Sequence, residues 1–340
     1  MTLISIVIPV FNRARLIEKT LNSVRGQTLA NWECIIVDDV STDETRTITS
    51  SLIKGDNRFK LLVRSQNYKS GGNGARNMGL KHAQGTHIIF FDSDDLLHSK
   101  ALKERLEDVI ANPDCDCYLY KTQLFKKEPE DLQFIWNTQN PDESIEDLTR
   151  RFIEQDMPWH TNGALWTRTF LDKIGGWDED LKVWQDWEFH IRALTQNPKL
   201  YCDTEKPDNY YRINNFNSIA SSHNSESYIH NVSLALKKVE ILLWDKLKKE
   251  ESLRLSYNYL IVRNLIQYPL FHGMRTLPFK MVFTVNYRSL SFIRYLSKSI
   301  FIWFFSFYKM RHLAKKITYF DRLKTKSTHL KISLETTYEH

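Results

Sequence analysis

Three carboxylates, Asp92, Asp94 and Asp95, follow directly on an apolar run at residues 88–91. The run is typical of a buried parallel strand, and open α/β sheets bind ligands at the carboxyl ends of their strands. Acidic side chains held by a rigid strand suit Mg²⁺ or Mn²⁺, which take oxygen ligands and keep positions open for substrate phosphates. The simpler alternative is a polar turn in which one Asp caps the next helix.

The chain around these acids alternates strand-like and helix-like segments, which predicts a parallel sheet with right-handed crossovers. Apolar, β-rich runs at residues 5–10, 32–37 and 59–63 predict strands before the acidic one. The second of these runs also ends in two acids, Asp38 and Asp39. Two strands of the predicted sheet therefore end in acid pairs at the same rim.

A glycine-rich loop at residues 70–77 leads into a predicted helix. It is not a Walker sequence, because no Gly-Lys-Ser/Thr follows, and it lacks the dinucleotide spacing after the first strand. Its glycines allow close backbone approach, and Arg76 and Asn77 stand at a helix start, where a phosphate can be held. A flexible turn without a ligand is the alternative.

A further carboxylate, Asp186, lies between Trp184 and Trp187 in a segment of helical periodicity at residues 183–194. Apolar neighbours raise the pKa of a carboxyl group, whereas a helix N-terminus lowers it. A carboxylate in this position can serve as a general base. The alternative is a helix cap or an ion-pair partner.

The composition fits one large domain or two smaller ones, and 42% of the residues are apolar, which is ample for a core. The four cysteines show no zinc spacing and are expected to be reduced in a cytosolic protein. The first residues predict a strand rather than a signal peptide. Residues 228–340 carry 20 Lys and Arg against 7 Asp and Glu, and the remainder carries 27 against 34. The two parts are therefore expected to have different roles.

The basic C-terminal part contains a very aromatic stretch at residues 292–308. Arg294 and Lys298 interrupt it, so its apolar run is too short to span a bilayer. We expect an amphipathic segment within residues 289–316 that can lie on an anionic membrane surface. The alternative is a helical subdomain with a solvated basic face. Nucleic acid binding is not expected, because no recognised motif occurs.

Several short motifs occur in a fixed order along the first two thirds of the chain. They are SIVIPVFNR at residues 5–13, IVDDVSTD at 36–43, GARN at 74–77, FDSDD at 91–95, GGWDE at 175–179 and QDW at 185–187. This ordered set resembles family 2 glycosyltransferases with the GT-A fold, over roughly residues 1–220. The set is specific for the family but not for the sugar.

The resemblance implies an inverting, metal-dependent transferase that uses a nucleotide-sugar, with Mn²⁺ or Mg²⁺ as the cofactor. By position, Asp186 resembles the catalytic base, Asp94 and Asp92 the metal-binding acids, and Asp39 the residue that reads the base, usually uracil. The nucleotide-sugar pocket is expected to include Pro9, Phe11, Arg13, Asp39, Arg76, Asp92 and Ser93. The acceptor side is expected to include Trp159, His160, Trp184 and Gln185.

The sequence departs from the family pattern at two positions. Gln185 stands where the family usually has Glu, which bears on a secondary acid but not on the base. Asn214 stands where members often have His, so a metal ligand from that loop is left open. His223 lies nearby in the sequence and is expected to be a surface residue.

The expected fold is α/β of the GT-A type, with a mainly parallel central sheet flanked by helices and a helical, basic and aromatic C-terminal extension. The expected domains are a catalytic one at residues 1–222, with a nucleotide-sugar half at about 1–98 and an acceptor half at about 99–222, and a C-terminal region at 223–340.

The expected function is transfer of a sugar from a UDP-sugar to a hydroxyl of a saccharide or lipid-linked saccharide acceptor, in the assembly of a bacterial surface polysaccharide. The expected location is cytoplasmic, peripheral at the inner face of the cell membrane. One alternative is an inactive sugar-nucleotide-binding or scaffold protein, which the presence of Asp92, Asp94 and Asp186 disfavours. Another is a nucleotidyltransferase, which would need a glycine- and basic-rich loop where residues 9–13 stand.

Overall fold

The computed structural model of the protein describes residues 4–136, 140–203, 205–213, 225–271, 274, 276–284, 287–290 and 292–307. The chain divides into two compact units. The first, which we call the sheet unit, comprises Met1–Ser144 and Met157–Phe216, and the second, the helical unit, comprises Ile145–Asp156 and Asn217–His340. The helical unit thus takes in residues 145–156, well ahead of the boundary at residue 222 expected from the sequence.

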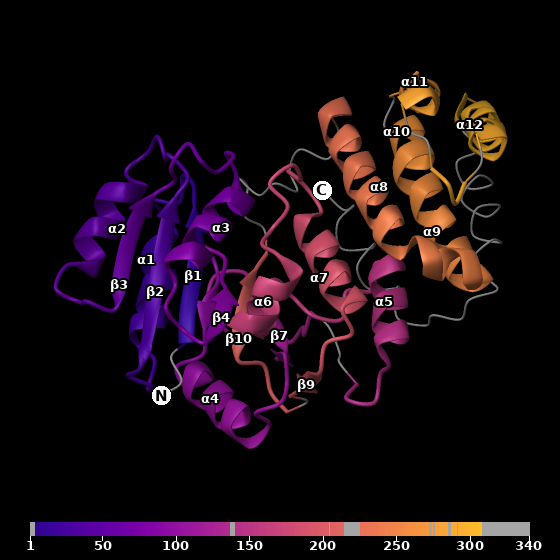
Figure 1. The fold of residues 1–340 in the computed structure, drawn as a ribbon. Helices are drawn as coiled ribbons and strands as arrows, with labels where there is room; N and C mark the ends of the chain where they lie inside the picture. Colours follow the sequence, from indigo (N-terminus) through magenta and orange to yellow (C-terminus); the bar gives the residue numbers. More distant parts are fainter. Residues whose placement is uncertain are drawn as a thin grey trace. The chain divides into compact units, whose positions relative to one another are not determined.

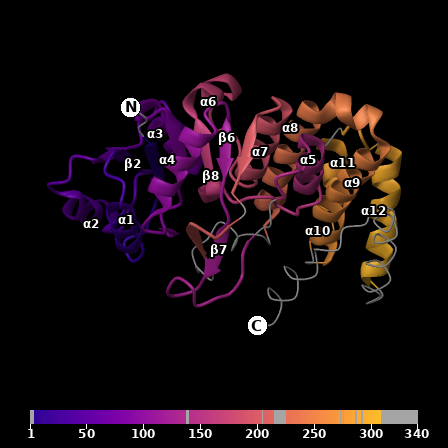
Figure 2. The ribbon, with the colours of Figure 1, turned by 90° about the horizontal axis from the view of Figure 1, so that it is seen from below.

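The sheet unit is built on a seven-stranded sheet. Across it, the order is β3 (Phe59–Val63), β2 (Trp32–Asp38), β1 (Ile4–Val10), β4 (His87–Phe90), β8 (Ala164–Thr167), β6 (Cys117–Leu119) and β9 (Leu200–Cys202). Figure 1 shows β3, β2 and β1 side by side, and Figure 2 shows β8 beside β6. Only the pairings of β8 with β4 and β6 are antiparallel among the described strands of this sheet. The prediction of a mainly parallel sheet is confirmed.

The register of β1 with its neighbours fixes the rim at which the acids lie. Val10 of β1 pairs with Asp38 of β2, and Val7 pairs with Phe90 of β4. The backbone N–H of Phe91 donates to the carbonyl of Val7 at 2.9 Å, which continues the pairing beyond β4. Parallel strands with this register end close together, so both acid pairs emerge at one edge of the sheet.

Helices cover both faces of the sheet, because alternate strand residues point to opposite sides. Ile4, Ile6 and Ile8 of β1 lie in one buried cluster with residues of α1 (Ile17–Arg25) and α4 (Ala101–Ala111), against which α2 (Thr45–Ile53) also packs. On the other face, α3 (Gly72–His82) comes so close that a Cβ on Gly79 would overlap the Val7 side chain. α6 (Arg168–Ile174) and α7 (Gln185–Thr195) share that face, since Phe189 of α7 packs on Phe90 and Trp166.

A second, three-stranded sheet brings a distant part of the chain to the acids. Its order is β5 (Leu96–Leu97), β10 (Asn209–Arg212) and β7 (Thr122–Phe125), with β10 antiparallel to β5 and parallel to β7. Because β5 follows the acidic stretch directly, its pairing with β10 sets Tyr211 and Arg212 beside that stretch.

A buried ion pair fastens this second sheet to α4. The guanidinium of Arg105 donates to both carboxylate oxygens of Asp208, at 2.6 and 2.9 Å, and both side chains are almost fully buried. Arg105 also donates to the carbonyl of Asn162 at 3.0 Å. Breaking such a pair by removing one partner typically costs about 3–5 kcal/mol, so this contact fixes the segment around Asn162 firmly.

The helical unit confirms the predicted helical C-terminal region. Its elements are α5 (Ile145–Ile153), α8 (Glu226–Lys249), α9 (Glu251–Val262), a π-helical segment (Arg263–Gln267), α10 (Tyr268–Phe271), α11 (Leu277–Thr284) and α12 (Phe292–Phe307). α5 packs against α9, and Arg150 of α5 forms an ion pair of 3.3 Å with Glu250. Within the described residues, no helix combines the length and apolarity needed to cross a bilayer.

Candidate functional site

The rim of the sheet holds Asp39 in a fixed position. Its backbone N–H donates to Val10 at 2.8 Å, and its carboxylate forms an ion pair with Arg64 of the segment after β3. The other carboxylate oxygen accepts the N–H of Gly71 at 2.7 Å. Gly71 has φ +120, a backbone conformation that glycine adopts readily. Asp39 therefore anchors the glycine-rich loop, in addition to the role that its position predicts.

The acid at Asp92 is paired with Arg76 of α3. The guanidinium donates to Asp92 Oδ1 at 2.7 Å and lies 4.6 Å over the ring of Trp177, so the cation is stacked as well as paired. The backbone N–H of Asp92 donates to Asn162 Oδ1 at 3.0 Å. The Asp92 side chain remains 28% exposed, which leaves part of the carboxylate accessible to a ligand.

The third acid of the stretch, Asp95, is fully buried. Its oxygens accept hydrogen bonds from Asn162 Nδ2 at 2.6 Å and from the backbone N–H of Arg212 at 2.7 Å. Burial, followed by the charges of Asp94 and Asp92, raises the pKa of Asp95 well above its usual range. Asp95 therefore ties β10 and the segment of Asn162 to the end of β4.

Asp92, Asp95 and His160 form a group that can hold a metal ion. Each offers one ligand atom, and these atoms all lie within 4.8 Å of one another. Carboxylate oxygens suit Mg²⁺ and Mn²⁺, so the donor set fits the cation that the resemblance implied. Asp94 lies beside this group and forms an ion pair of 3.6 Å with Arg13.

A backbone hydrogen bond fixes the state of His160. Its Nδ1 accepts the N–H of Asn162 at 3.3 Å, so a neutral imidazole here carries its proton on Nε2. Burial lowers the pKa of His160, while the charges of Asp92, Asp186 and Asp94 oppose that shift. As long as this hydrogen bond persists, His160 acts as a donor from Nε2, and it can bind a metal through Nε2 only if the hydrogen bond is given up.

Asp186 lies in the first turn of α7 and accepts the N–H of Trp187 at 2.9 Å. The residue before the helix, Trp184, has φ 57 and ψ 24, so the chain turns sharply there. The charges of Asp186, Asp92 and Asp94 all act on both His160 and Tyr211. The predicted base and the predicted metal-binding acids therefore act electrostatically on the same two rings, although they are far apart in the sequence.

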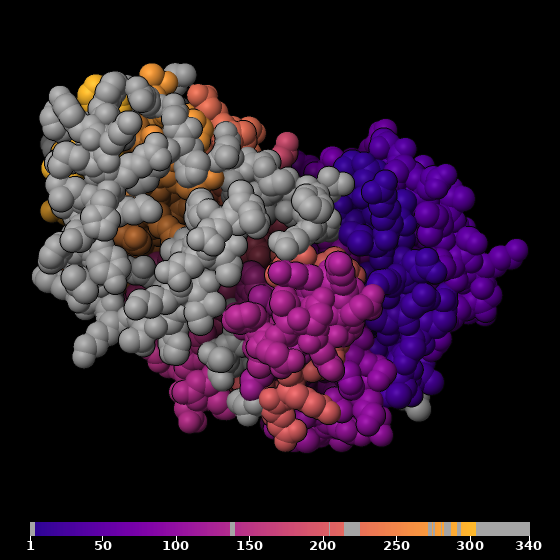
Figure 3. Space-filling model, turned by 180° about the vertical axis from the view of Figure 1, so that it is seen from behind, coloured from indigo at the N-terminus to yellow at the C-terminus, as the bar shows by residue number. Residues whose placement is uncertain are grey.

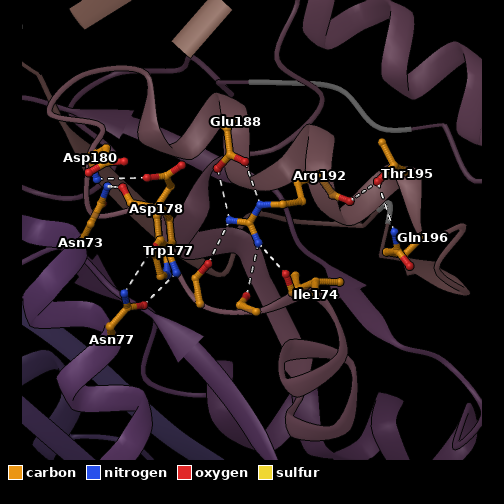
Figure 4. A network of polar contacts seen from close by, with 12 residues as sticks. Asn73, Asn77, Ile174, Trp177, Asp178, Asp180, Glu188, Arg192, Thr195 and Gln196 are labelled. Atoms are coloured by element: carbon orange, nitrogen blue, oxygen red, sulfur yellow. Dashed lines mark hydrogen bonds and ion pairs between the residues drawn. The ribbon is translucent and has the colours of Figure 1, made fainter. Parts of the chain in front are cut away.

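A network of polar contacts holds the loop before α7, as Figure 4 shows. Asn77 of α3 accepts the N–H of Trp177 at 2.7 Å and donates back to its carbonyl at 2.8 Å. From α7, Arg192 donates to the carbonyls of Ile174 and Gly176 at 2.7 and 2.9 Å. The same guanidinium pairs with Glu188 at 2.7 Å. The loop is thus clamped between the helix that carries Arg76 and the helix that carries Asp186.

The remaining predicted residues differ in their exposure. Phe11 is 49% exposed beyond β1, and Pro9 lies in β1 opposite Val37. Ser93 is buried, and its carbonyl accepts a hydrogen bond of 3.1 Å from Thr20. Trp184 packs edge-on against Trp187, and Gln185 Oε1 is buried without a hydrogen-bond partner among the described residues. Asn214 and His223 lie outside the described residues.

One acceptor-side candidate is part of the core. Trp159 is 2% exposed and donates from Nε1 to His190 Nδ1 at 3.1 Å. Burial, followed by the charge of His160, lowers the pKa of His190 to about 3. The indole therefore offers no open face to a ligand in this structure.

Several residues of the site were not singled out from the sequence. Asn162 and Arg212 bind Asp95, Arg64 binds Asp39, and the ring of Tyr211 packs against that of His160 in a tilted arrangement. Asp95 itself lies in the motif FDSDD at residues 91–95, and its position close to two other acids is the sequence feature that marks it as a candidate for the site. The others come from strand pairings across long sequence separations, which no local pattern indicates.

Comparison with known proteins identifies the family. Residues 5–168 match the family described as "Glycosyl transferase family 2". That part of the chain therefore belongs to glycosyl transferase family 2, and the resemblance seen in the sequence is confirmed. A curated relative, GalNAc(5)-diNAcBac-PP-undecaprenol beta-1,3-glucosyltransferase of Campylobacter jejuni, is 37% identical over 128 residues, which are 37% of this chain and 41% of the relative. The chain spans less than half the length of the first such relatives it matches.

Solved structures support the fold. Staphylococcus aureus TarS 1–349 in complex with UDP-GlcNAc is similar with a TM-score of 0.66 and 19% identity, over 92% of both chains. The mannosyltransferase PcManGT of Pyrobaculum calidifontis, in complex with GDP-Man and Mn²⁺, is similar with a TM-score of 0.52 and 14% identity, over 94% of this chain and 86% of that one. The predicted GT-A fold is confirmed.

The clamp on the loop before α7 leads to a stability prediction. Arg192→Met leaves the carboxylate of Glu188, whose side chain is 4% exposed, buried without its cation. We expect a loss of about 3–5 kcal/mol in the free energy of unfolding, measured by urea denaturation followed through tryptophan fluorescence.

The control is an exposed pair with the same helical spacing. Lys103 and Glu107 lie 3.8 Å apart with side chains 58% and 62% exposed, so Lys103→Met should cost no more than about 0.5 kcal/mol. Equal losses in the two variants would contradict a clamping role for Arg192.

Proposed function

We propose that the protein is an inverting glycosyltransferase that moves a sugar from a nucleotide-sugar, a UDP-sugar in the first instance, to a hydroxyl of a saccharide or lipid-linked saccharide acceptor. The observation that carries the proposal is that Arg76, which pairs with Asp92 at 2.7 Å, lies 4.6 Å over Trp177 of the loop that leads into the helix of Asp186. The charges of Asp92, Asp94 and Asp186 also act on the same two rings, His160 and Tyr211. The acids for the donor and the acid for the acceptor would thus serve one site.

The donor side has cations suited to a diphosphate. Arg76 and Arg13 reach Asp92 and Asp94 at 2.7 and 3.6 Å, so both guanidinium groups lie where negative charge develops on the leaving group. Asp39 would read the base, and Pro9 and Phe11 would line the nucleotide. A divalent cation held by Asp92 and Asp94, with the carboxyl group of Asp95 as a neighbour, would supply charge compensation for the leaving diphosphate.

Asp186 would act as the general base. A hydroxyl is a poor nucleophile, and a carboxylate that accepts its proton as it attacks is worth about 10²–10⁴-fold in rate. When attack comes from the face opposite the leaving group, one displacement inverts the anomeric centre, by the logic that governs inverting hydrolases. The helix position of Asp186 and the clamp on the preceding loop would hold the base in place.

The relatives agree with this proposal. The name of the Campylobacter jejuni relative describes transfer of glucose to an undecaprenol-linked saccharide. Of the similar structures, one is a complex with UDP-GlcNAc and another a complex with GDP-Man and Mn²⁺. The alternative, an inactive sugar-nucleotide-binding or scaffold protein, would not need a carboxylate at Asp186. A nucleotidyltransferase is the weaker alternative, because it would need a glycine- and basic-rich loop where residues 9–13 stand.

The base assignment predicts the effect of Asp186→Asn. A panel of UDP-, GDP- and dTDP-sugars with Mn²⁺ first identifies the donor that the wild-type protein turns over. The variant should then lose about 10²–10⁴-fold in turnover while its affinity for that donor stays within twofold. Asp172→Asn, at an exposed Asp on α6, is the charge-matched control and should keep full activity. Near wild-type turnover by the Asp186→Asn variant would remove the assignment.

The metal assignment predicts that Mn²⁺ strengthens UDP binding through Asp94. Asp94→Asn should abolish the gain in UDP affinity on addition of Mn²⁺, measured by calorimetry, because the amide is a poorer ligand and no longer offsets the cation. Chelation of the metal with EDTA should reduce the wild-type protein to the level of the variant. If Asp94→Asn keeps the Mn²⁺ effect and Asp92→Asn removes it, the cation is held by the group of Asp92, Asp95 and His160 instead.

We further propose peripheral docking on the inner face of the cell membrane through residues 289–316, of which the structure describes those up to 307 apart from residue 291. Ile300 and Phe301 of α12 are 53% and 41% exposed, and Arg294 and Lys298 belong to the same helix. Apolar and basic side chains on one helix suit an anionic interface. A membrane-bound acceptor would make such docking useful.

Docking predicts that Ile300→Asp with Phe301→Asp lowers co-sedimentation with vesicles containing phosphatidylglycerol by about tenfold or more, because burial of one large apolar side chain is worth ~1.5–3 kcal/mol. Leu255→Asp on α9, where Leu255 is 40% exposed, is the matched control and should sediment like the wild type. Equal sedimentation of all three proteins would end the docking proposal.

A further inference from the structure

An exposed aromatic segment lies beside the site but has no role in the chemistry above. It follows β7, where the backbone N–H of Leu124 donates to Phe134 and that of Trp136 donates to Thr122, both at 2.8 Å. Gln123 and Ile135 form an antiparallel bridge, and Gln123 Nε2 donates to Leu132 at 2.6 Å. The segment at residues 132–136 is therefore held to the edge of the second sheet as a short extended strand.

The turn that leads to this segment is also fixed. Asp131 accepts the backbone N–H groups of Lys126, Lys127 and Glu128, at 2.9, 2.8 and 3.3 Å. Glu128 pairs with Lys19 of α1 at 2.5 Å. In Figure 3 the magenta surface around residues 120–136 adjoins the indigo surface of the N-terminal residues. The segment is thus a supported part of the sheet unit.

Trp136 is the residue of this segment that reaches the site. Its ring lies edge-on to Tyr211 at 5.2 Å and to His160 at 5.7 Å, and those two rings lie 4.6 Å apart. His160 and Tyr211 are the rings on which Asp92, Asp94 and Asp186 act. Trp136 is nevertheless 40% exposed, so a large apolar surface is offered to solvent next to the rings of His160 and Tyr211.

The chemistry of this position suits a sugar ring. A pyranose has an apolar C–H face and an edge of hydroxyl groups, and the site offers an indole together with carboxylates and the Nε2 donor of His160. Side chains two residues apart on an extended segment lie on the same face, so Phe134, which is 50% exposed, extends the aromatic surface away from the site. A lipid acyl chain could not form hydrogen bonds with the adjacent carboxylates and imidazole, so a saccharide suits this position better.

We propose that Trp136, supported by Tyr211 and His160, is the platform for the pyranose ring of the saccharide acceptor, and that Phe134 contacts the next sugar residue. This inference rests on the proposed function for the identity of the acceptor. It assigns recognition of the acceptor to stacking on a residue outside the family motifs.

The test measures binding of simple glycosides to the full chain with UDP and Mn²⁺ present. The probes are the phenyl β-glycosides of glucose, N-acetylglucosamine and N-acetylgalactosamine, and the readout is the dissociation constant from ligand-observed NMR. Trp136→Ala should weaken binding of the preferred glycoside about tenfold or more, as loss of a stacked aromatic contact implies. Trp136→Phe should show a smaller loss, and Phe134→Ala should affect a disaccharide glycoside more than the monosaccharide.

Ile135→Ala is the matched control, because Ile135 is 41% exposed on the same segment but faces the other way. It should leave glycoside binding within twofold, and all variants should keep the wild-type affinity for UDP and the wild-type melting temperature. Equal losses for Trp136→Ala and Ile135→Ala, or no binding of any of the three glycosides to the wild-type protein, would overturn the platform.

Two further outcomes separate this inference from its neighbours. If Trp136→Ala lowers co-sedimentation with phosphatidylglycerol vesicles but leaves glycoside binding intact, the segment contacts lipid and the platform is wrong. If the wild-type protein binds the glycosides through Trp136 but binds neither UDP nor GDP, the saccharide platform stands and the proposed transferase function fails.

Discussion

The sheet unit depends on the crowding of like charge at the end of β4. Two carboxylates about 4 Å apart repel by roughly 4 kcal/mol at an effective dielectric constant of about 20, and here three acids occur within four residues. Each has a different compensation: Arg76 for Asp92, Arg13 for Asp94, and neutral hydrogen-bond donors for the buried Asp95. The acids can share one rim only because the fold brings these partners to it.

The partners come from parts of the chain that only the complete fold brings together. Arg13 follows β1, Arg76 lies on α3, Asn162 lies in the turn before β8, and Arg212 ends β10. Asn162 joins these parts most directly, because its side chain bonds to both Asp92 and Asp95 while its carbonyl accepts a hydrogen bond from Arg105. The buried pair of Arg105 and Asp208 therefore affects the site indirectly, because it fixes Asn162, which in turn orients Asp92 and Asp95.

The sequence predicted the parts of this arrangement that depend on local pattern. Apolar runs that stop at acids predicted the parallel strands and their common rim. The partner of each acid could not be predicted in this way, because the pairing of β10 with β5 and the insertion of residues 145–156 into the helical unit depend on contacts between distant segments. For Trp159, the local pattern was misleading. An aromatic residue beside a His suggested a ligand-binding surface, but Trp159 is buried and donates a hydrogen bond to His190, so it belongs to the core.

The site combines charged groups with two aromatic rings that carry no charge. The guanidinium groups that pair with the acids lie on the segment after β1 and on α3, and that of Arg212 in β10 donates to the carbonyl of Asp94. Asp186 stands at the start of α7 and accepts a backbone N–H of its own helix. Burial lowers the pKa of His160 and raises that of Tyr211, so both rings favour their neutral forms. Neutral rings add no charge to the site, so the compensation of Asp92 and Asp94 depends on the guanidinium groups of Arg76 and Arg13.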